Sequence, residues 1–185
     1  KYFGQTADMI KKGWEENGKE AAEAGTKLHA NIEDFYNNKN VNNDSIEYKF
    51  FLNFHKDHND LVPFRTEWCV YDDDLKLCGS IDMIFKNNDE SLSIYDWKRC
   101  KEIKKTNEWG EKGLKPYLEN LDDCNFYHYA LQLNIYKAIL EKNYDHKVKD
   151  LYIVCLHPNN KNGDYQKYIL PDLQKEVSEL FEERE

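Results

Sequence analysis

The chain lacks several features that would place it in a familiar class of protein. Its five cysteines include no C-x-x-C pair, and their odd number and wide spacing argue against a disulfide framework, a zinc site or an iron–sulfur cluster. No apolar run approaches the roughly 20 residues that a membrane-spanning helix needs, and no signal-peptide or transit-type segment opens the chain. We therefore expect no membrane association and a reducing compartment, such as the cytosol, the nucleus or the mitochondrial matrix.

The sequence also lacks an excess of basic residues. It has 26 Lys and Arg against 35 Asp and Glu, so its formal net charge is −9. This charge argues against a protein that binds nucleic acid through its overall charge. Residues 98–105 are nevertheless locally basic, while acidic residues gather at 72–74 and near the C-terminus. Because an electrostatic field is local, an acidic protein can still bind DNA through one basic groove.

The 185 residues, 40% of them hydrophobic, are enough for a single domain with a hydrophobic core. Helical and alternating periodicities predict an α/β protein. The expected elements, in chain order, are N-terminal helices within 5–56, a three-stranded antiparallel meander within 63–99, a mostly irregular excursion at 100–123, an amphipathic helix at 123–142, and C-terminal strands and a helix within 149–184.

Two local features of these helices lead to further expectations. Gly25 and Thr26 interrupt the first helical pattern, which predicts a break or close packing near His29. Pro171 is expected to start the last helix, because a proline at the first helical position lacks only an N–H that would be unbonded anyway.

Charged side chains stand inside two of the expected strands. Asp82 lies in the apolar segment 79–85, and Asp96 and Lys98 lie two residues apart on the next strand, so they point to the same face. If the strands pair through the short turn at 86–90, Asp82 comes alongside them. Such a group suits hydrolysis of a phosphodiester: the acids hold a divalent ion that activates water, and the lysine stabilises the developing charge.

Three further features of the chain fit this interpretation. His29 follows the Gly-Thr pair on a helix, and Glu67 lies in the strand before Asp82. Gln132 and Tyr136 are four residues apart, so they share one face of a later helix. Taken alone, His29 is typical of a buried histidine bonded to a carbonyl, and Tyr136 of a core residue.

In this order, Gly-Thr-x-x-His, an acid, Gly-x-Ile-Asp, Asp-x-Lys and Gln-x-x-x-Tyr resemble the RecB-like nucleases of the PD-(D/E)XK superfamily. Similar arrays occur in the RecB and AddAB nuclease domains, the mitochondrial genome-maintenance exonuclease and the CRISPR-associated exonucleases. The resemblance spans about residues 14–140. It implies a restriction-endonuclease-like core, with a mixed central sheet flanked by helices. It also implies an exonuclease, rather than an endonuclease, acting on single-stranded or free-ended DNA.

The resemblance also implies roles for the residues at the centre of the array. Asp82 and Asp96 would be the principal ligands of Mg²⁺ or Mn²⁺, joined by the backbone carbonyl of Trp97. Lys98 would be the catalytic lysine. His29 would be a further metal ligand, typical of the branch that often prefers manganese.

Other residues of the array would act around the metal. Glu67 would be an additional catalytic acid near the ion or its waters, while Gln132 and Tyr136 would contact the nucleic acid or steady the site. Four basic side chains that lead out of the site are expected to contact phosphates: Arg99, Lys101, Lys104 and Lys105. The chain has no ATP-binding P-loop, so any helicase would be a separate domain or partner.

Two alternatives remain open. Cap-snatching RNA endonucleases also combine a helix histidine with two acids and a lysine, and prefer manganese, but they lack the Gln-x-x-x-Tyr helix. A catalytically silent domain of the same fold, serving as a nucleic-acid-binding module, would fit the negative charge. An intact set of Asp82, Asp96 and Lys98 would have no use in such a domain.

Overall fold

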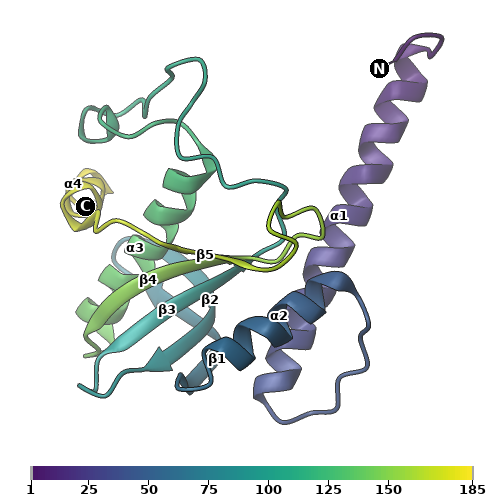
Figure 1. The fold of residues 1–185 in the computed structure, drawn as a ribbon. Coiled ribbons are helices and arrows are strands. Elements are labelled where there is room, and N and C mark those ends of the chain that lie inside the picture. The colour runs from purple at the N-terminus through teal and green to yellow at the C-terminus, as the bar shows by residue number, and fades with distance from the viewer. Residues whose placement is uncertain (1, 185) are drawn as a thin grey trace.

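The computed structural model describes residues 2–184, and a mixed five-stranded sheet of order β1-β2-β3-β4-β5 forms its centre (Figure 1). The strands are β1 (Val62–Asp72), β2 (Leu77–Lys86), β3 (Leu92–Lys98), β4 (Val148–Cys155) and β5 (Gln166–Ile169). The helices are α1 (Ala7–Tyr36), α2 (Ile46–Asp57), α3 (Asn125–Asn143) and α4 (Gln174–Arg184), with a short 3-10 helix η1 (Pro116–Leu118). The expectation of an α/β protein with a mixed sheet flanked by helices is confirmed.

The order and direction of the strands follow from their connections. Short turns join β1 to β2 and β2 to β3, so these strands form the expected antiparallel meander. The long connection through α3 lets β4 run parallel to β3, and β5 then returns antiparallel to β4. The segment 100–123 between β3 and α3 is mostly irregular, as expected, apart from η1 and a bridge between Lys112 and Asp122.

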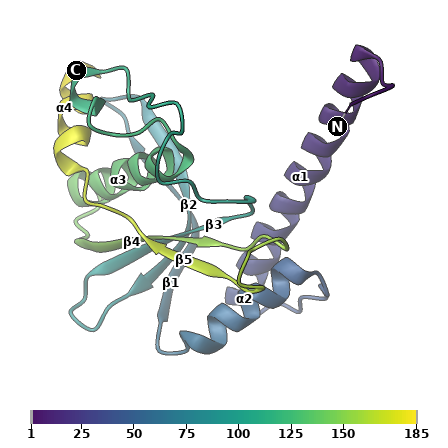
Figure 2. The ribbon, with the colours of Figure 1, turned by 45° about the horizontal axis from the view of Figure 1, so that its top comes forward.

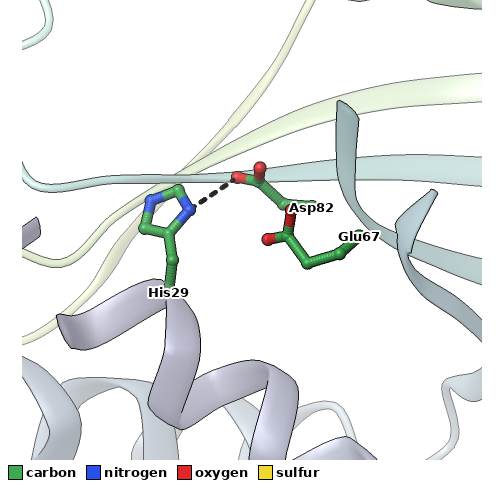
Figure 3. A group of neighbouring side chains, drawn as sticks. All are labelled: His29, Glu67 and Asp82. Carbon is green, nitrogen blue, oxygen red and sulfur yellow. Dashed lines mark ion pairs between the residues drawn. The ribbon is translucent and has the colours of Figure 1, made fainter. Parts of the chain in front are cut away.

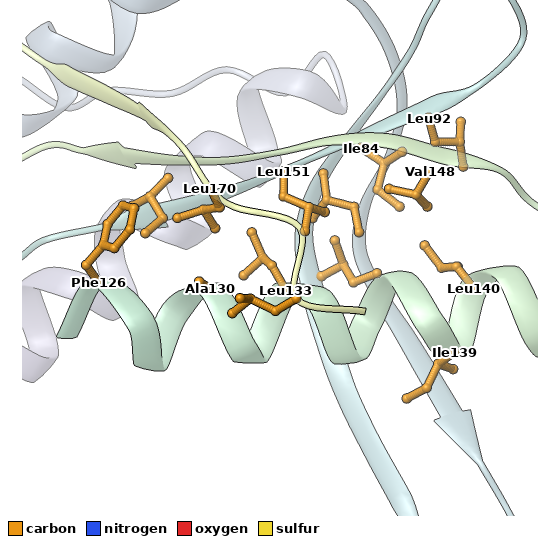
Figure 4. Close-up of a cluster of buried hydrophobic side chains, with 14 of the residues drawn as sticks. Ile84, Leu92, Phe126, Ala130, Leu133, Ile139, Leu140, Val148, Leu151 and Leu170 are labelled. Atoms are coloured by element: carbon orange, nitrogen blue, oxygen red, sulfur yellow. The ribbon is translucent and has the colours of Figure 1, made fainter. Parts of the chain in front are cut away.

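Each face of the sheet is covered by helices, and each cover forms its own hydrophobic core. On one face, α1 and α2 contribute Leu28, Ile32, Phe51 and Phe54, which cluster with Met83, Phe85, Tyr95 and Trp97 of the sheet. On the other face, Figure 4 shows α3 packed below the strands, with Ala130, Leu133 and Leu140 directed towards Ile84, Leu92 and Leu151. Burying a side chain of this size stabilises the fold by roughly 1.5–3 kcal/mol.

Helix α1 is continuous, so the expected break at Gly25 and Thr26 is wrong. Gly25 has no atom within 4 Å of an added Cβ, so no close packing surrounds it. A glycine inside a helix costs only about 1 kcal/mol relative to alanine, and burial of Leu28 and Ile32 anchors the helix after it. The N-terminal half stands away from the sheet (Figure 2). None of the helices in residues 2–184 is long and apolar enough to cross a bilayer.

The last helix begins at Gln174, so the expectation that Pro171 starts it is also wrong. The fully buried Asn134 of α3 makes hydrogen bonds to residues 171–173, which precede α4. Its amide donates to the carbonyl oxygen of Pro171 at 3.0 Å and its Oδ1 accepts from the backbone N–H of Leu173 at 3.0 Å. These tertiary hydrogen bonds hold residues 171–173 outside the helix.

Asp72, at the end of β1, makes a buried polar contact between the sheet and α3. Its carboxylate accepts from Leu75 N at 3.0 Å and from Asn143 Nδ2 at 3.0 Å, and lies 2.9 Å from Lys142 Nζ. The hydrogen bond from Leu75, helped by Lys142 and Asn143, lowers the pKa of Asp72 to about 2. The charged carboxylate therefore stabilises the folded state at neutral pH.

Replacing Asp72 by Asn is expected to lower the free energy of unfolding at pH 7 by about 1.5–3 kcal/mol, the usual effect of hydrogen bonds to a charged group. Because the folded pKa lies below the ordinary value of about 4, the stabilisation is present above pH 4 and is lost as the pH falls towards 2. Urea unfolding at pH 7 and pH 3 should therefore show a smaller difference at pH 3. Asp73→Asn, at a more exposed acid, should change little; an equal effect there would contradict the prediction.

Candidate metal site

The acidic side chains lie where β2 and β3 separate. The ladder between these strands ends at the pair Met83–Tyr95; beyond it, β2 continues along β1, and β3 continues along β4. One further step of the same register places Asp82 opposite Asp96. There the backbone N–H of Trp97 donates to Asp82 Oδ2 at 2.8 Å, so a side chain replaces the backbone acceptor of the ladder. The fork between the two strands therefore opens beside both acids.

Three side chains from three different elements meet at this fork. His29 comes from α1, Glu67 from β1 and Asp82 from β2, and one ligand atom of each lies within 4.8 Å of the others. Figure 3 shows the imidazole and the two carboxylates directed towards one another. His29 Nδ1 lies 3.5 Å from Asp82 Oδ2, and Ser80 Oγ donates to Glu67 Oε2 at 2.9 Å. Residues far apart in the chain thus form a compact set of one nitrogen and two oxygen donors.

The backbone of Glu67 has an unusual conformation for a strand residue, with φ at 42°. On one side of it, Thr66 Oγ1 accepts from Asn37 Nδ2 at the end of α1. On the other side, Trp68 packs in the core that α3 covers. Residues 66 and 68 would share a face in a regular strand, so β1 changes face at Glu67. The local strain, of the order of 1–3 kcal/mol, accompanies the placement of this carboxylate at the fork.

This strain predicts an unusual order of stability at position 67. Glu67→Gly is expected to be more stable than Glu67→Ala by about 1 kcal/mol, because only glycine adopts a positive φ without steric cost. At the neighbouring Thr66 the order should be reversed, with alanine the more stable by about 0.5–1 kcal/mol. Urea unfolding of the four variants without metal measures both differences. The same order at both positions would show that β1 is regular at Glu67.

Asp96 and Lys98 form an ion pair on the adjoining strand, on the same face as their spacing predicts. Lys98 Nζ lies 2.7 Å from Asp96 Oδ2 and 4.6 Å from the centre of the Tyr129 ring on α3. Asp96 is only 5% exposed. No hydrogen bond to its Oδ2 is found among the described residues, so the contact of this oxygen with the Lys98 ammonium is an ion pair.

Burial and neighbouring charges shift the pKa values of these groups. Burial, together with the charge of Asp82, raises the pKa of Asp96 to about 7, although Lys98 opposes this. Burial also raises the pKa of Glu67, despite the hydrogen bond from Ser80. Burial lowers the pKa of His29, but the Asp82 carboxylate outweighs it and the net pKa is raised. Such perturbed groups in one place are typical of functional sites.

The residues at the fork fit a divalent ion such as Mg²⁺ or Mn²⁺. Carboxylate oxygens are the donors that both ions prefer, and one imidazole nitrogen suits the softer Mn²⁺ better than Mg²⁺. The ligand atoms of His29, Glu67 and Asp82 are close enough to share one ion. Asp96 is paired with Lys98 and lies outside this group of three, so its expected role as a metal ligand stays a prediction. The N–H of Trp97 donates to Asp82, and the expected role of the Trp97 carbonyl as a metal ligand stays a prediction.

Gln132 and Tyr136 bond to each other on α3, with Gln132 Nε2 donating to Tyr136 OH at 3.0 Å. The Tyr136 ring lies directly over Gly79 of β2, where an added Cβ would come within 2.4 Å of the ring. Tyr136 therefore packs α3 against the strand that carries Asp82. This arrangement favours a supporting role for Tyr136, and a role for either residue in binding nucleic acid stays a prediction.

The contact between Gly79 and Tyr136 predicts that substitutions at these two positions have non-additive effects on the free energy of unfolding. Gly79→Ala is expected to lower the free energy of unfolding by about 1–3 kcal/mol through overpacking. In the double variant with Tyr136→Ala the added methyl has room, so most of that cost should disappear. A double-mutant cycle by urea unfolding should give an interaction energy of at least about 1 kcal/mol. Additive effects would contradict the close approach.

Of the four basic residues expected to contact phosphates, Arg99 and Lys101 line one groove and the other two do not. Arg99 Nε binds Glu47 Oε1 of α2 at 2.7 Å, and Lys104 Nζ lies 2.8 Å from Glu108 Oε1. Lys105 lies over aromatic rings of the α3 side, and Lys101 lines a groove of about 880 Å³ beside the N-terminal half of α1. Contacts with phosphates stay a prediction, and Lys101 is the most available of the four.

Ser80 and Tyr129 support the site but are missing from the sequence-based set. Ser80 stands two residues before Asp82, so strand periodicity alone would place both side chains on one face. Tyr129 stands three and seven residues before Gln132 and Tyr136, so the helical period puts all three on one face. Both signals are present in the sequence. Neither signal identifies the residue that each side chain contacts, which is Glu67 for Ser80 and Lys98 for Tyr129.

Comparison with protein-family models and with curated proteins yields no match for this chain.

Proposed function

We propose that this protein is a divalent-metal-dependent nuclease with a PD-(D/E)XK-type core, most similar in its motifs to the RecB-like exonucleases. The observation that carries the proposal is the convergence of His29, Glu67 and Asp82, with ligand atoms within 4.8 Å of one another, beside the buried pair of Asp96 and Lys98. A structural role explains this set poorly, because the buried Asp96 and the half-buried Glu67 both have raised pKa values, and so their charged forms are unfavourable in the fold.

The residues divide into groups that hold a cation and groups that act on the substrate. When bound, Mg²⁺ or Mn²⁺ would lower the pKa of a coordinated water and neutralise phosphate charge. His29, Glu67, Asp82 and Asp96 would hold it. Lys98 has its ammonium at the rim of this group and 19% of its side chain exposed. It would donate to a non-bridging phosphate oxygen, whose charge grows during attack.

Three supports keep these groups in place before the substrate arrives. The N–H of Trp97 orients Asp82, and the hydroxyl of Ser80 orients Glu67. The ring of Tyr129 limits where the Lys98 ammonium can lie. Because the supports come from strands and a helix, the ligand geometry is set by the fold, as an efficient metal site requires.

The choice of DNA with a free end or single-stranded character rests on the motif resemblance. RNA is the main competing substrate, since the same donors serve an RNA endonuclease that uses manganese. The third reading, a silent nucleic-acid-binding module, predicts binding without cleavage.

The test is cleavage of end-labelled single-stranded and duplex DNA, linear and circular, and of an RNA control. Each substrate is incubated with Mn²⁺, Mg²⁺ or EDTA. Metal-dependent loss of linear DNA with circles spared would support an end-dependent exonuclease. Cut circles would place the protein among endonucleases, and cleavage of RNA alone would favour the RNA endonuclease. No cleavage of any substrate with either metal would overturn the proposal and favour the binding module.

A further inference from the structure

The thiols of Cys100 and Cys155 lie side by side next to Lys98. Cys100 follows Lys98 by two residues, and Cys155 is the partner of Lys98 in the register between β3 and β4. The two sulfur atoms are 3.8 Å apart, and Cys155 Sγ also donates to the carbonyl oxygen of Cys100 at 3.1 Å. The pair thus joins the strand that carries Asp96 and Lys98 to its parallel neighbour.

We propose that Cys100 and Cys155 form a reversible disulfide that lowers the activity of the site at the fork. The effect on activity rests on the proposed nuclease function, whereas formation of the bond does not. A disulfide needs sulfur atoms about 2 Å apart, so the observed 3.8 Å has to close by a small movement of the chain after β3. The remaining cysteines (Cys69, Cys78 and Cys124) have no such contact recorded among the described residues.

The two thiols have complementary exposure and acidity. Cys155 is fully buried, while Cys100 is partly exposed and can meet a small molecule. The hydrogen bond between the sulfurs lowers the pKa of Cys155 to about 7 and raises the pKa of Cys100. Cys155, the more acidic thiol, can therefore act as the base that takes the proton of Cys100 when Cys100 attacks a small molecule.

The oxidation is a pair of thiol–disulfide exchanges with a small-molecule disulfide as the oxidant. Cys100 attacks one sulfur of that molecule as its proton passes to Cys155, forms a mixed disulfide and releases the first small thiolate. The Cys155 thiolate then attacks the Cys100 sulfur and releases the second. One protein disulfide forms as the small disulfide breaks, two cysteines are oxidised, and the two thiol protons pass to the released thiolates.

Closing the bond changes the position of Lys98. The hydrogen bond from Cys155 Sγ to the Cys100 carbonyl is lost, and residue 100 is drawn towards β4. Lys98 is two residues away, and its ammonium is held against Asp96 and the ring of Tyr129. Because a displacement of about 1 Å in a positioned group can cost about 100-fold in rate, we expect the oxidised protein to cleave at least about 10-fold more slowly.

The test treats the protein with oxidised glutathione and then measures the bond and the activity separately. Intact mass and peptide mapping report whether Cys100 is joined to Cys155, and cleavage of the substrate established above reports activity before and after addition of dithiothreitol. Cys100→Ser should cleave at the wild-type rate and be insensitive to oxidised glutathione, and Cys155→Ala gives a second test at the buried position. The matched control is the double variant Cys69→Ser and Cys78→Ser, which should keep the sensitivity.

The outcomes separate the proposals. A mapped Cys100–Cys155 bond with a reversible loss of activity supports the inference. Failure of the bond to form, or a bond that leaves the cleavage rate unchanged, overturns it. If the reduced wild type cleaves nothing, the nuclease proposal fails and the control of activity fails with it, while peptide mapping still decides whether the bond forms.

Discussion

Asp82→Asn is expected to abolish metal-dependent cleavage while leaving the metal-free fold about as stable as the wild type. Asp82 is the residue that His29 and Glu67 both approach, and its Oδ2 lies 3.5 Å from His29 Nδ1. An amide keeps an oxygen that can accept the hydrogen bond from the N–H of Trp97. It loses the negative charge that a divalent ion needs.

The expected loss of Mn²⁺ affinity exceeds about 100-fold, because even the outer partners of a ligand are usually worth 10–100-fold. Without metal, two effects oppose each other. The ion pair with His29 is weakened, but the charge that raises the pKa of Asp96 is also removed. We therefore expect the metal-free free energy of unfolding to change by less than about 1 kcal/mol.

Isothermal titration calorimetry with Mn²⁺ measures the affinity, and urea unfolding with and without Mn²⁺ measures the stability. The wild type should be stabilised by Mn²⁺ and the variant should not. Asp73→Asn, at an acid that is 86% exposed, serves as the matched control and should bind Mn²⁺ like the wild type. Unchanged Mn²⁺ binding in Asp82→Asn would remove Asp82 from the site.

Lys98→Met is expected to lower the rate of cleavage by about 100- to 1000-fold, the usual loss when one positioned donor to a developing charge is removed. Methionine keeps an unbranched apolar chain that still packs on the Tyr129 ring, and it removes only the ammonium. Mn²⁺ binding should persist, because the ligands at His29, Glu67 and Asp82 stay in place. The two variants therefore separate the binding of metal from the chemical step.

The same variant has a stability effect that depends on metal. Removing Lys98 leaves Asp96 buried without its cation, which should lower the metal-free free energy of unfolding by about 3 kcal/mol. Mn²⁺ should recover most of this loss, since it supplies positive charge at the same carboxylate. Lys101→Met, three residues further along the chain, is the control for loss of a basic side chain. If Lys98→Met cleaved DNA at the wild-type rate, Lys98 would have no role in the chemical step.

The sequence alone determined what depends on local periodicity. Alternation in the strands placed Asp96 and Lys98 on one face, and the short turn at 86–90 left little freedom in the pairing that brings Asp82 alongside. The spacing of Gln132 and Tyr136 placed both on one face of α3, where they bond to each other. These relations hold because strand and helix geometry repeats over a few residues.

The sequence was less informative wherever a tertiary contact competes with a local preference. Gly25 interrupts the helical pattern, yet burial of Leu28 and Ile32 carries α1 through it. Pro171 suits the start of a helix, yet hydrogen bonds from Asn134 hold the chain outside the helix until Gln174. In both places tertiary contacts, burial in one and hydrogen bonds in the other, outweigh the local propensity of one residue.

Only the tertiary structure decided which distant residues share the fork. It carried His29 on α1 to within 3.5 Å of Asp82, turned β1 at Glu67, and set Cys155 beside Cys100. It also placed Arg99 and Lys101 along one groove without Lys104 and Lys105, and paired Arg99 with Glu47. The physical reason is that such contacts join segments many residues apart, and their geometry depends on how two separate cores pack against one sheet. No local period of the chain encodes that packing.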